Sequence, residues 1–385
     1  MVKELIADRL GEVKEYYFSK KLREIADLKS QGIDVLNLGI GSPDIAPAKE
    51  VEEALAEGLK EKGYQQYQPY KGIPELRKAF ASWYQEHFSV ALNPESEILP
   101  LIGSKEGIMH IAMAFLNPGD QVLLPNPGYP SYASASKMAG AELAYYSLNE
   151  KNKYFPDFEA LEGQDLSKVK IMWVNYPHMP TGTDGNDVLF ERLLDFSRKH
   201  QIIVVNDNPY AFILTEQRNS LLRNRAENDL VLELSSLSKA HNMAGWRVGA
   251  VAGNRELIQP ILTFKSNMDS GQFKPVMRAA ITALSLPASW YEGLNEEYRK
   301  RRALVFEIAR LLGCHFDEKQ VGMFVWCTIP ESWDHAEKFA DHLLEKYRIF
   351  IPPGTVFGSE GKNYIRFSLC SEVGVWNEVL TRIKA

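Results

Sequence analysis

The chain has 385 residues, of which 45% are hydrophobic, 24% charged and 11% aromatic. This composition is typical of a globular protein and argues against a disordered or fibrous chain, while the length predicts two or three domains. The net charge of −6 offers no excess of basic residues, so we expect neither nucleic acid nor a membrane surface as a partner.

The three cysteines are widely spaced and include no Cys-x-x-Cys pair, which argues against a disulfide framework and against a zinc site. The segment Met1–Arg9 mixes both charges where a secretion signal would need an unbroken apolar run. No stretch reaches the roughly 20 apolar residues that would span a bilayer. We therefore expect a cytoplasmic protein in a reducing compartment, without membrane contact.

Strand and helix patterns alternate along most of the chain. An amphipathic helix that ends near Gly32 precedes a strand at residues 35–38, and a helix that starts after Gly103 ends near Asn117. Short apolar runs, which predict buried strands, recur at residues 98–102, 122–124, 171–174, 202–205, 230–234 and 248–252. Such strands, alternating with helices, predict an α/β fold whose mostly parallel sheet is covered on both faces.

The pattern changes near Pro287. A long helix runs from there to Gly313 and is followed by strand-like segments and a second amphipathic helix. This arrangement predicts a smaller α+β domain beside the α/β layer. We expect a large domain of residues 44–280 and a small domain formed by residues 1–43 and 281–385.

The most informative segment, residues 235–249, places Lys239 in a serine-rich loop between two apolar strands. A lysine becomes a carbonyl-reactive amine when burial or nearby cations lower its pKa. Ser236, Ser238 and Arg247 are suited to hold an anionic group such as a phosphate. The alternative is a solvated loop lysine, and the flanking strands by themselves favour the functional interpretation only modestly.

Other polar residues follow predicted strands directly, at the sheet edge where open α/β sheets bind their ligands. These residues are Ser104, Lys105, Tyr129, Asn175, Asp207 and Tyr210. Ser104 and Lys105 open a helix, whose free N–H groups attract phosphate. Each residue has a structural alternative: a turn or cap for Asp207, a capped helix start for Ser104, and a packed ring for Tyr129.

Arg366 lies within the apolar strand at residues 364–368, where an inward-pointing guanidinium needs an anionic partner. The eight histidines show no metal-ligand spacing, so we predict no metal site. The segment Gly39–Pro43 lacks the third glycine of a dinucleotide-binding loop. Neither a Gly-x-Ser-x-Gly elbow nor a Walker sequence is present.

Taken together, these segments resemble fold-type I, class I/II aminotransferases that use pyridoxal 5′-phosphate (PLP). The likeness runs in order through almost the whole chain, from Leu38–Asp44 and Tyr67–Arg77 to Ile351–Gly358 and the Arg366 strand. It implies the aspartate aminotransferase-like fold, with a large domain around the mostly parallel sheet and a smaller α+β domain. It also implies ping-pong transfer of an amino group from an L-amino acid to a 2-oxo acid.

The resemblance implies that Lys239 forms the internal aldimine with the cofactor and then moves the proton at the substrate Cα. Asp207 would pair with the pyridine nitrogen, Tyr210 would donate a hydrogen bond to the ring oxygen O3′, and Tyr129 would stack on the ring. The other residues that this resemblance assigns to the cofactor are Ser104, Lys105, Asn175, Ser236, Ser238 and Arg247. The serines and the arginine of this set would hold the phosphate.

By the same resemblance, Tyr67 reaches the phosphate of a neighbouring subunit, so the working unit is expected to be a homodimer with shared sites. Arg366 would clamp the α-carboxylate of the substrate, with the backbone of Gly41 beside it. Tyr17 and Phe18 are expected to border the side-chain pocket. Lys105 weakly favours a dicarboxylic or diamino-dicarboxylic substrate, and a solvated lysine at a helix start is the equal alternative.

One residue departs from the family pattern. The family usually has an Asn before Pro-Thr-Gly, and its amide donates a hydrogen bond to O3′; this chain has Met179, whose thioether cannot donate. A PLP-dependent C–S β-lyase of the same fold is therefore the alternative function. A non-catalytic PLP-sensing domain is less expected, because the first motif begins at Leu38 and leaves no room before it for a DNA-binding domain.

Overall fold

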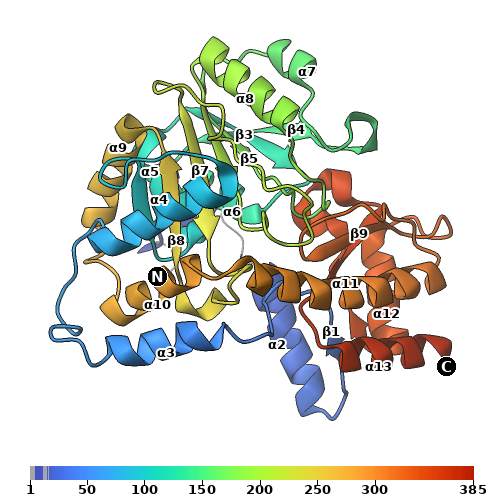
Figure 1. The fold of residues 1–385 in the computed structure, drawn as a ribbon. Helices are drawn as coiled ribbons and strands as arrows, with labels where there is room; N and C mark the ends of the chain where they lie inside the picture. Colours follow the sequence, from blue (N-terminus) through green and yellow to red (C-terminus); the bar gives the residue numbers. More distant parts are fainter. Residues whose placement is uncertain (1–4, 12–14, 16) are drawn as a thin grey trace.

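The computed structural model describes residues 5–11, 15 and 17–385, and its centre is a seven-stranded sheet (Figure 1). In spatial order the strands are β2 (Ile98–Leu101), β8 (Gly249–Gly253), β7 (Val231–Ser236), β6 (Ile203–Asp207), β5 (Val169–Val174), β3 (Gln121–Asn126) and β4 (Glu142–Ser147). Only β8 runs antiparallel to its neighbours within this sheet. The predicted mostly parallel sheet is confirmed.

Both faces of the sheet are covered by helices, because side chains of alternating strand residues enter different hydrophobic clusters. In β6, Val204 packs into one cluster, and Ile203 and Val205 pack into the other. The first face carries α3 (Lys49–Gly58), α4 (Pro74–Phe88), α8 (Asp187–His200) and α10 (Lys274–Leu284). The second face carries α5 (Ser104–Phe115), α6 (Pro130–Met138) and α9 (Arg255–Ser266).

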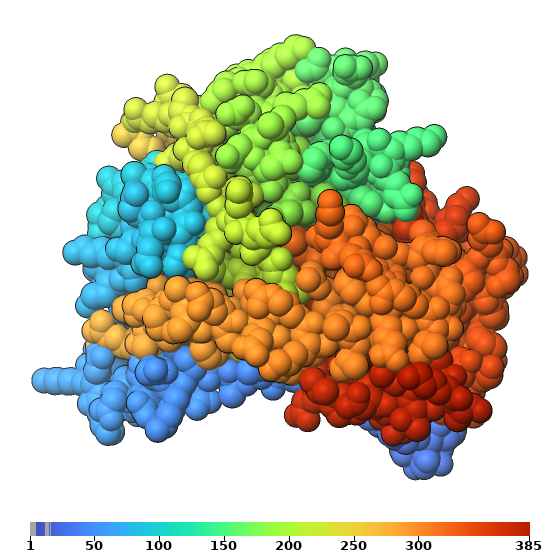
Figure 2. Space-filling view, turned by 45° about the vertical axis from the view of Figure 1, so that its right-hand side comes forward, coloured from blue at the N-terminus to red at the C-terminus, as the bar shows by residue number. Residues whose placement is uncertain are grey.

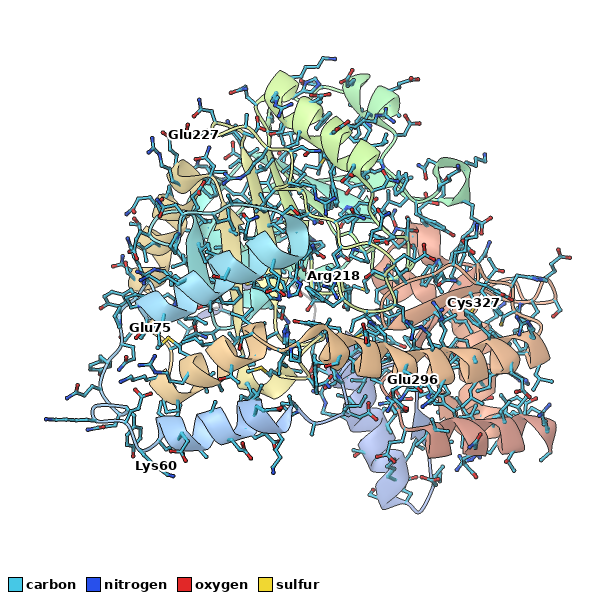
Figure 3. All side chains as sticks on the ribbon, in the orientation of Figure 1. Lys60, Glu75, Arg218, Glu227, Glu296 and Cys327 are labelled. Atoms are coloured by element: carbon cyan, nitrogen blue, oxygen red, sulfur yellow. The ribbon has the colours of Figure 1, made fainter. Side chains whose placement is uncertain are left out.

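The C-terminal region forms a second layer beside the sheet. Its elements are α11 (Ala288–Leu311), β9 (Phe324–Thr328), α12 (Ala336–Tyr347), β10 (Ile349–Phe350), β11 (Tyr364–Ser368) and α13 (Val373–Lys384). β9 and β11 pair antiparallel, and Cys327 of β9 is buried in this region (Figure 3). Figure 2 shows the orange α11 crossing the molecule between the sheet region and the red α13.

The N-terminal segment joins this C-terminal region and not the sheet. α2 (Tyr17–Ser30) leads to β1 (Leu36–Asn37), as Figure 1 shows. β1 pairs in parallel with β10. The backbone N–H of Ser368 also donates to the carbonyl of Leu38. The division into a large domain of residues 44–280 and a small domain of residues 1–43 and 281–385 stays a prediction, and residues 1–4, 12–14 and 16 lie outside the described part.

The remaining helices are short. They are the α-helices α1 (Asp8–Gly11) and α7 (Phe158–Glu162) and the 3₁₀ turns Glu150–Asn152, Ala244–Trp246, Gly354–Phe357 and Ser359–Gly361.

Three strands differ from what the sequence predicted. β4 was not predicted, because this edge strand has a half-exposed side and lacks a continuous apolar run. β6 extends to Asp207 and β7 to Ser236, so both residues belong to strand ends instead of loops.

None of the helices in the described residues is both long and apolar enough to cross a membrane. Within the same residues, no group of three His, Cys, Asp or Glu side chains is placed to hold a metal ion.

Candidate active site

A cavity of about 820 Å³ lies where the carboxyl ends of the parallel strands meet the β9–β11 sheet. Tyr129 follows β3, Asn175 follows β5, Asp207 ends β6, and Ser236 ends β7. Parallel strands bring such residues to one edge, although they are far apart in the sequence. The predicted site residues that line the cavity are Gly41, Ser104, Lys105, Tyr129, Asn175, Asp207, Tyr210, Ser236, Ser238, Lys239, Arg247 and Arg366.

Two predicted site residues lie elsewhere. Tyr67 is 90% exposed and does not line the cavity of its own chain. Tyr17 lines a neighbouring cavity, whereas the next residue, Phe18, is buried and lines the main one. The two rings meet edge to face, with centroids 5.6 Å apart.

Lys239 lies in the turn after β7, and its amine donates a hydrogen bond to the carbonyl oxygen of Gly41. Burial lowers the pKa of Lys239, and the nearby Arg366 and Arg247 act in the same direction. A lowered pKa leaves more of the amine in its neutral, nucleophilic form. The amine is therefore prepared for carbonyl chemistry and for proton transfer.

Asp207 is buried at the end of β6. Its Oδ2 accepts a hydrogen bond from the hydroxyl of Tyr132 at 2.8 Å, and none of the described residues hydrogen-bonds to its Oδ1. Burial raises the pKa of Asp207 to about 6, while the Tyr132 hydrogen bond and the charge of Lys239 oppose that rise. A buried carboxylate oxygen without a partner fits a protonated ring nitrogen of a ligand.

The part of the cavity beside the start of α5 is suited to bind a phosphate. Together with the part around Asp207, it forms one half of the cavity. α5 begins at Ser104 after Gly103, whose φ of +81° favours glycine. A side chain at Gly103 would also overlap the guanidinium of Arg247, so the glycine lets this cation approach the helix start. Backbone N–H groups at a helix start and a guanidinium together bind phosphate well.

Three further predicted residues, Asn175, Tyr210 and Lys105, line this part of the cavity. The amide of Asn175 donates to the carbonyl of Asp207 and accepts from the N–H of Met179, so it ties the ends of β5 and β6 together. Tyr210 is buried, and burial raises the pKa of its hydroxyl, which keeps its proton for hydrogen bonding. Partial burial and the nearby Arg247 lower the pKa of Lys105.

The other half of the cavity surrounds Arg366, which is buried in β11. Its Nη2 donates to the carbonyl of Gly39 at 2.7 Å, and its Nη1 lies 3.3 Å from the sulfur of Met179. The guanidinium carbon lies 3.9 Å, 4.5 Å and 5.5 Å from the ring centroids of Phe324, Phe357 and Phe18, respectively. Aromatic faces stabilise a guanidinium while leaving it able to bind a carboxylate.

Three further residues that line the cavity were not predicted from the sequence: Tyr132, Phe324 and Phe357. Tyr132 lies three residues after Tyr129, and a shared helix face was a usable signal for it. The two phenylalanines had no such signal, since apolar rings in strands and turns are also ordinary core residues.

The chain shows similarity to known proteins over nearly its whole length. The model of the family described as aminotransferase class I and II matches residues 33–383. An LL-diaminopimelate aminotransferase of Dehalococcoides mccartyi is 39% identical, with 94% of each chain covered, and one of Aquifex aeolicus is 37% identical, with 98% of each covered. The structure of BacF from Bacillus subtilis superposes with a TM-score of 0.94 at 33% identity, covering 98% of this chain and 97% of that one.

Proposed function

The chain belongs to the class I and II aminotransferases, which use PLP, and we propose that the cavity described above is its active site. One observation carries the assignment of residues: a single cavity brings together the amine of Lys239, the unpartnered oxygen of Asp207 and the guanidinium of Arg366. These are the three groups that the transfer of an amino group between an amino acid and a 2-oxo acid needs.

The cofactor half fits PLP. Bound PLP supplies an electron sink that stabilises negative charge at the substrate Cα. Asp207 would hold the ring nitrogen through Oδ1, and Tyr210 would donate to the ring oxygen. Ser104, Arg247 and the serines at the end of β7 would bind the phosphate.

Lys239 would carry the proton transfer. Its amine lies on the same wall of the cavity as Gly41, to whose carbonyl it donates. With a lowered pKa, the free amine would accept the proton from the substrate Cα and deliver it to the cofactor carbon C4′, and the second half of the reaction would run the same transfers in reverse on the 2-oxo acid. This assignment makes Lys239 the catalytic residue.

Arg366 would bind the α-carboxylate, because its fork of donors matches two carboxylate oxygens. A side chain at Gly41 would overlap the ring of Phe324, so glycine lets this backbone pack directly against the ring that contacts Arg366. The hydrogen bond to Gly39 and the contacts with the rings of Phe324 and Phe357 hold the guanidinium in place before the substrate binds.

For the amino donor, the named relatives favour a diamino-dicarboxylic amino acid, and Lys105 in the cavity wall is suited to a second carboxylate. A second donor class is favoured by the lining around Arg366. Phe18, Phe324 and Phe357 offer apolar surface to a donor with a large apolar side chain.

A panel of amino donors with 2-oxoglutarate tests these proposals. We expect glutamate to form with LL-diaminopimelate, and formation with phenylalanine or leucine would support the second donor class. Release of pyruvate and ammonia from a sulfur amino acid, without glutamate, would instead identify the β-lyase. Borohydride reduction followed by mass spectrometry should find the cofactor on Lys239, and a label on another lysine would contradict the assignment.

We further propose a homodimer in which Tyr67 reaches the phosphate of the other subunit. Tyr67 is exposed near Tyr70, Met268 and Phe273, which are large apolar side chains that also face solvent. The segments that carry them lie side by side, since the rings of Tyr64 and Phe273 meet at 6.2 Å. Such a patch is typical of an interface between chains.

Analytical ultracentrifugation tests the dimer, and Tyr67→Phe tests the shared site. We expect a two-chain species and a weaker affinity for the cofactor in the variant, with Tyr145→Phe as an exposed control on β4. A monomer that binds cofactor and turns over would contradict the proposal. The free thiols of all three cysteines support the cytoplasmic location, which cell fractionation tests.

A further inference from the structure

The carboxylate of Asp207 has one hydrogen-bond donor among the side chains described, and this donor is Tyr132. The two oxygens of Asp207 are therefore unequal: Oδ2 accepts from the Tyr132 hydroxyl at 2.8 Å, and Oδ1 is buried without a partner in the described part of the chain. Both residues are almost fully buried and line the cavity. With this arrangement, Oδ2 is held by Tyr132, and Oδ1 is left to accept a hydrogen bond from a ligand.

Tyr132 is itself held firmly. It lies in α6, and its ring stacks on Trp173 of β5 with centroids 4.9 Å apart and planes inclined by 5°. The ring of Tyr129 meets it edge to face at 5.5 Å. Because the ring is packed on two sides, its hydroxyl has little freedom to leave Asp207.

The charges around the pair keep the proton on Tyr132. Burial, followed by the charge of Asp207, raises the pKa of Tyr132 well above its usual range, so its hydroxyl keeps the proton that it donates to Asp207. The other titratable groups that interact with the pair are Lys239 and Tyr210 at Asp207, and Tyr129 and Tyr210 at Tyr132; of these, Lys239 favours the ionised carboxylate. The Tyr132 hydrogen bond opposes the effect of burial on Asp207 more strongly than Lys239 does.

We propose that Tyr132 is a positioning residue for the cofactor ring, which keeps Asp207 ionised and turns Oδ1 toward the ring nitrogen. The inference rests on the proposed role of Asp207. Tyr132 touches the carboxylate and not the reacting atoms, so its effect passes through Asp207. Removing its hydroxyl leaves a buried carboxylate that gains a proton more easily and rotates more freely.

Tyr132→Phe tests this inference, since phenylalanine keeps the stacking on Trp173 and removes only the donor. The probe is pyridoxamine 5′-phosphate, which cannot bond covalently to Lys239, and its dissociation constant is measured on cofactor-free protein from pH 6 to pH 9. We expect binding to weaken by roughly tenfold or more at pH 7. The ratio between variant and wild type should shrink as the pH rises, because Asp207 is then ionised in both proteins.

Two controls separate this role from a structural one. Tyr146→Phe removes another buried hydroxyl, which donates to the carbonyl of Trp173 at 2.6 Å outside the cavity, and should leave the affinity unchanged. The analogue of the probe in which carbon replaces the ring nitrogen should bind Tyr132→Phe and wild type equally well.

Three results would overturn the inference. Unchanged affinity of Tyr132→Phe at every pH would show that its hydrogen bond does not matter to the ring. An equal loss for the probe and the analogue would give Tyr132 a general role in shaping the site. If wild type itself binds the probe and the analogue equally, Asp207 does not pair with the ring nitrogen, and the proposed cofactor site fails together with this inference.

Discussion

The two halves of the cavity are built in different ways. The half around Asp207 and Ser104 consists of strand ends and one helix start, so the rigid sheet fixes the position of its polar groups. The half around Arg366 is built from α2, β9 and the turn Gly354–Phe357, which lie outside the seven-stranded sheet, and its wall is aromatic. We infer that the first half is suited to an invariable anionic group, whereas a few ring positions in the second half can set the choice of substrate.

Lys239 lies where the two halves meet, and among the variants considered we expect Lys239→Ala to have the largest effect on turnover. Removing the amine should lower turnover on the order of 10⁴-fold, because the proton at the substrate Cα loses its acceptor. Cofactor affinity through the phosphate and ring contacts should largely remain. Steady-state kinetics and equilibrium dialysis measure both quantities; turnover close to wild type would contradict the role of Lys239.

Asp207→Asn probes the cofactor half alone. In the cofactor-free protein the pKa of Asp207 is raised to about 6, so ionising this buried group costs stability between its unfolded value near 3.8 and pH 6. The variant avoids that cost, and we expect its unfolding free energy, relative to wild type, to rise by on the order of 3 kcal/mol from pH 4 to pH 8. Urea unfolding followed by tryptophan fluorescence measures it.

Asp207→Asn should also bind the cofactor more weakly than wild type. The same substitution is therefore expected to raise the free energy of unfolding and to lower the affinity for the cofactor. Asp341→Asn, at an exposed position on α12, serves as the control for a lost carboxylate. Equal stability differences at the two pH values would show that Asp207 does not bear the cost of burial.

Arg366→Lys probes the substrate half. Lysine keeps the charge but loses the two-donor fork, so we expect a loss of about 10- to 150-fold in kcat/KM for every amino donor alike. Cofactor affinity should stay within about twofold of wild type, since Arg366 lies in the other half. Loss confined to acidic donors would show that Arg366 binds the side chain of the substrate instead.

Met179→Asn has the smallest expected effect and tests the boundary between the halves. The sulfur of Met179 lies against Arg366, and the amide of Asn175 is already bonded to the carbonyl of Asp207. An asparagine would donate a further hydrogen bond to the ring oxygen of the cofactor. The bound cofactor changes between its two absorbance bands as the pH rises, and we expect the midpoint of this titration to fall by about one pH unit. Met179→Leu, which adds no donor, should leave the midpoint unchanged.

An unchanged midpoint in Met179→Asn would show that the ring oxygen already has a second donor. A change in the preference among amino donors, without a change in the midpoint, would place residue 179 in the substrate half only.

Local patterns in the sequence placed the polar residues of the candidate site at one edge of the sheet, while their roles came from the resemblance to a known family. Lys239, Asp207 and Arg247 lie next to short apolar strands, and parallel strands must end at one edge, so the order of elements alone brought them together. The half-exposed strand β4 escaped the same reasoning, because its surroundings and not its composition make it a strand.

The aromatic wall and the partner of Asp207 were decided only by the tertiary structure. Tyr17 and Phe18 are neighbours in the sequence, but successive helix residues point about 100° apart, and only the packing of α2 selects Phe18 for the main cavity. Tyr132 looks like a core residue until Trp173 and Asp207 are seen around it. Strand ends and charged residues can be recognised from short stretches of sequence. The neighbours of a buried ring come from distant segments, so only the packing of those segments determines the role of the ring.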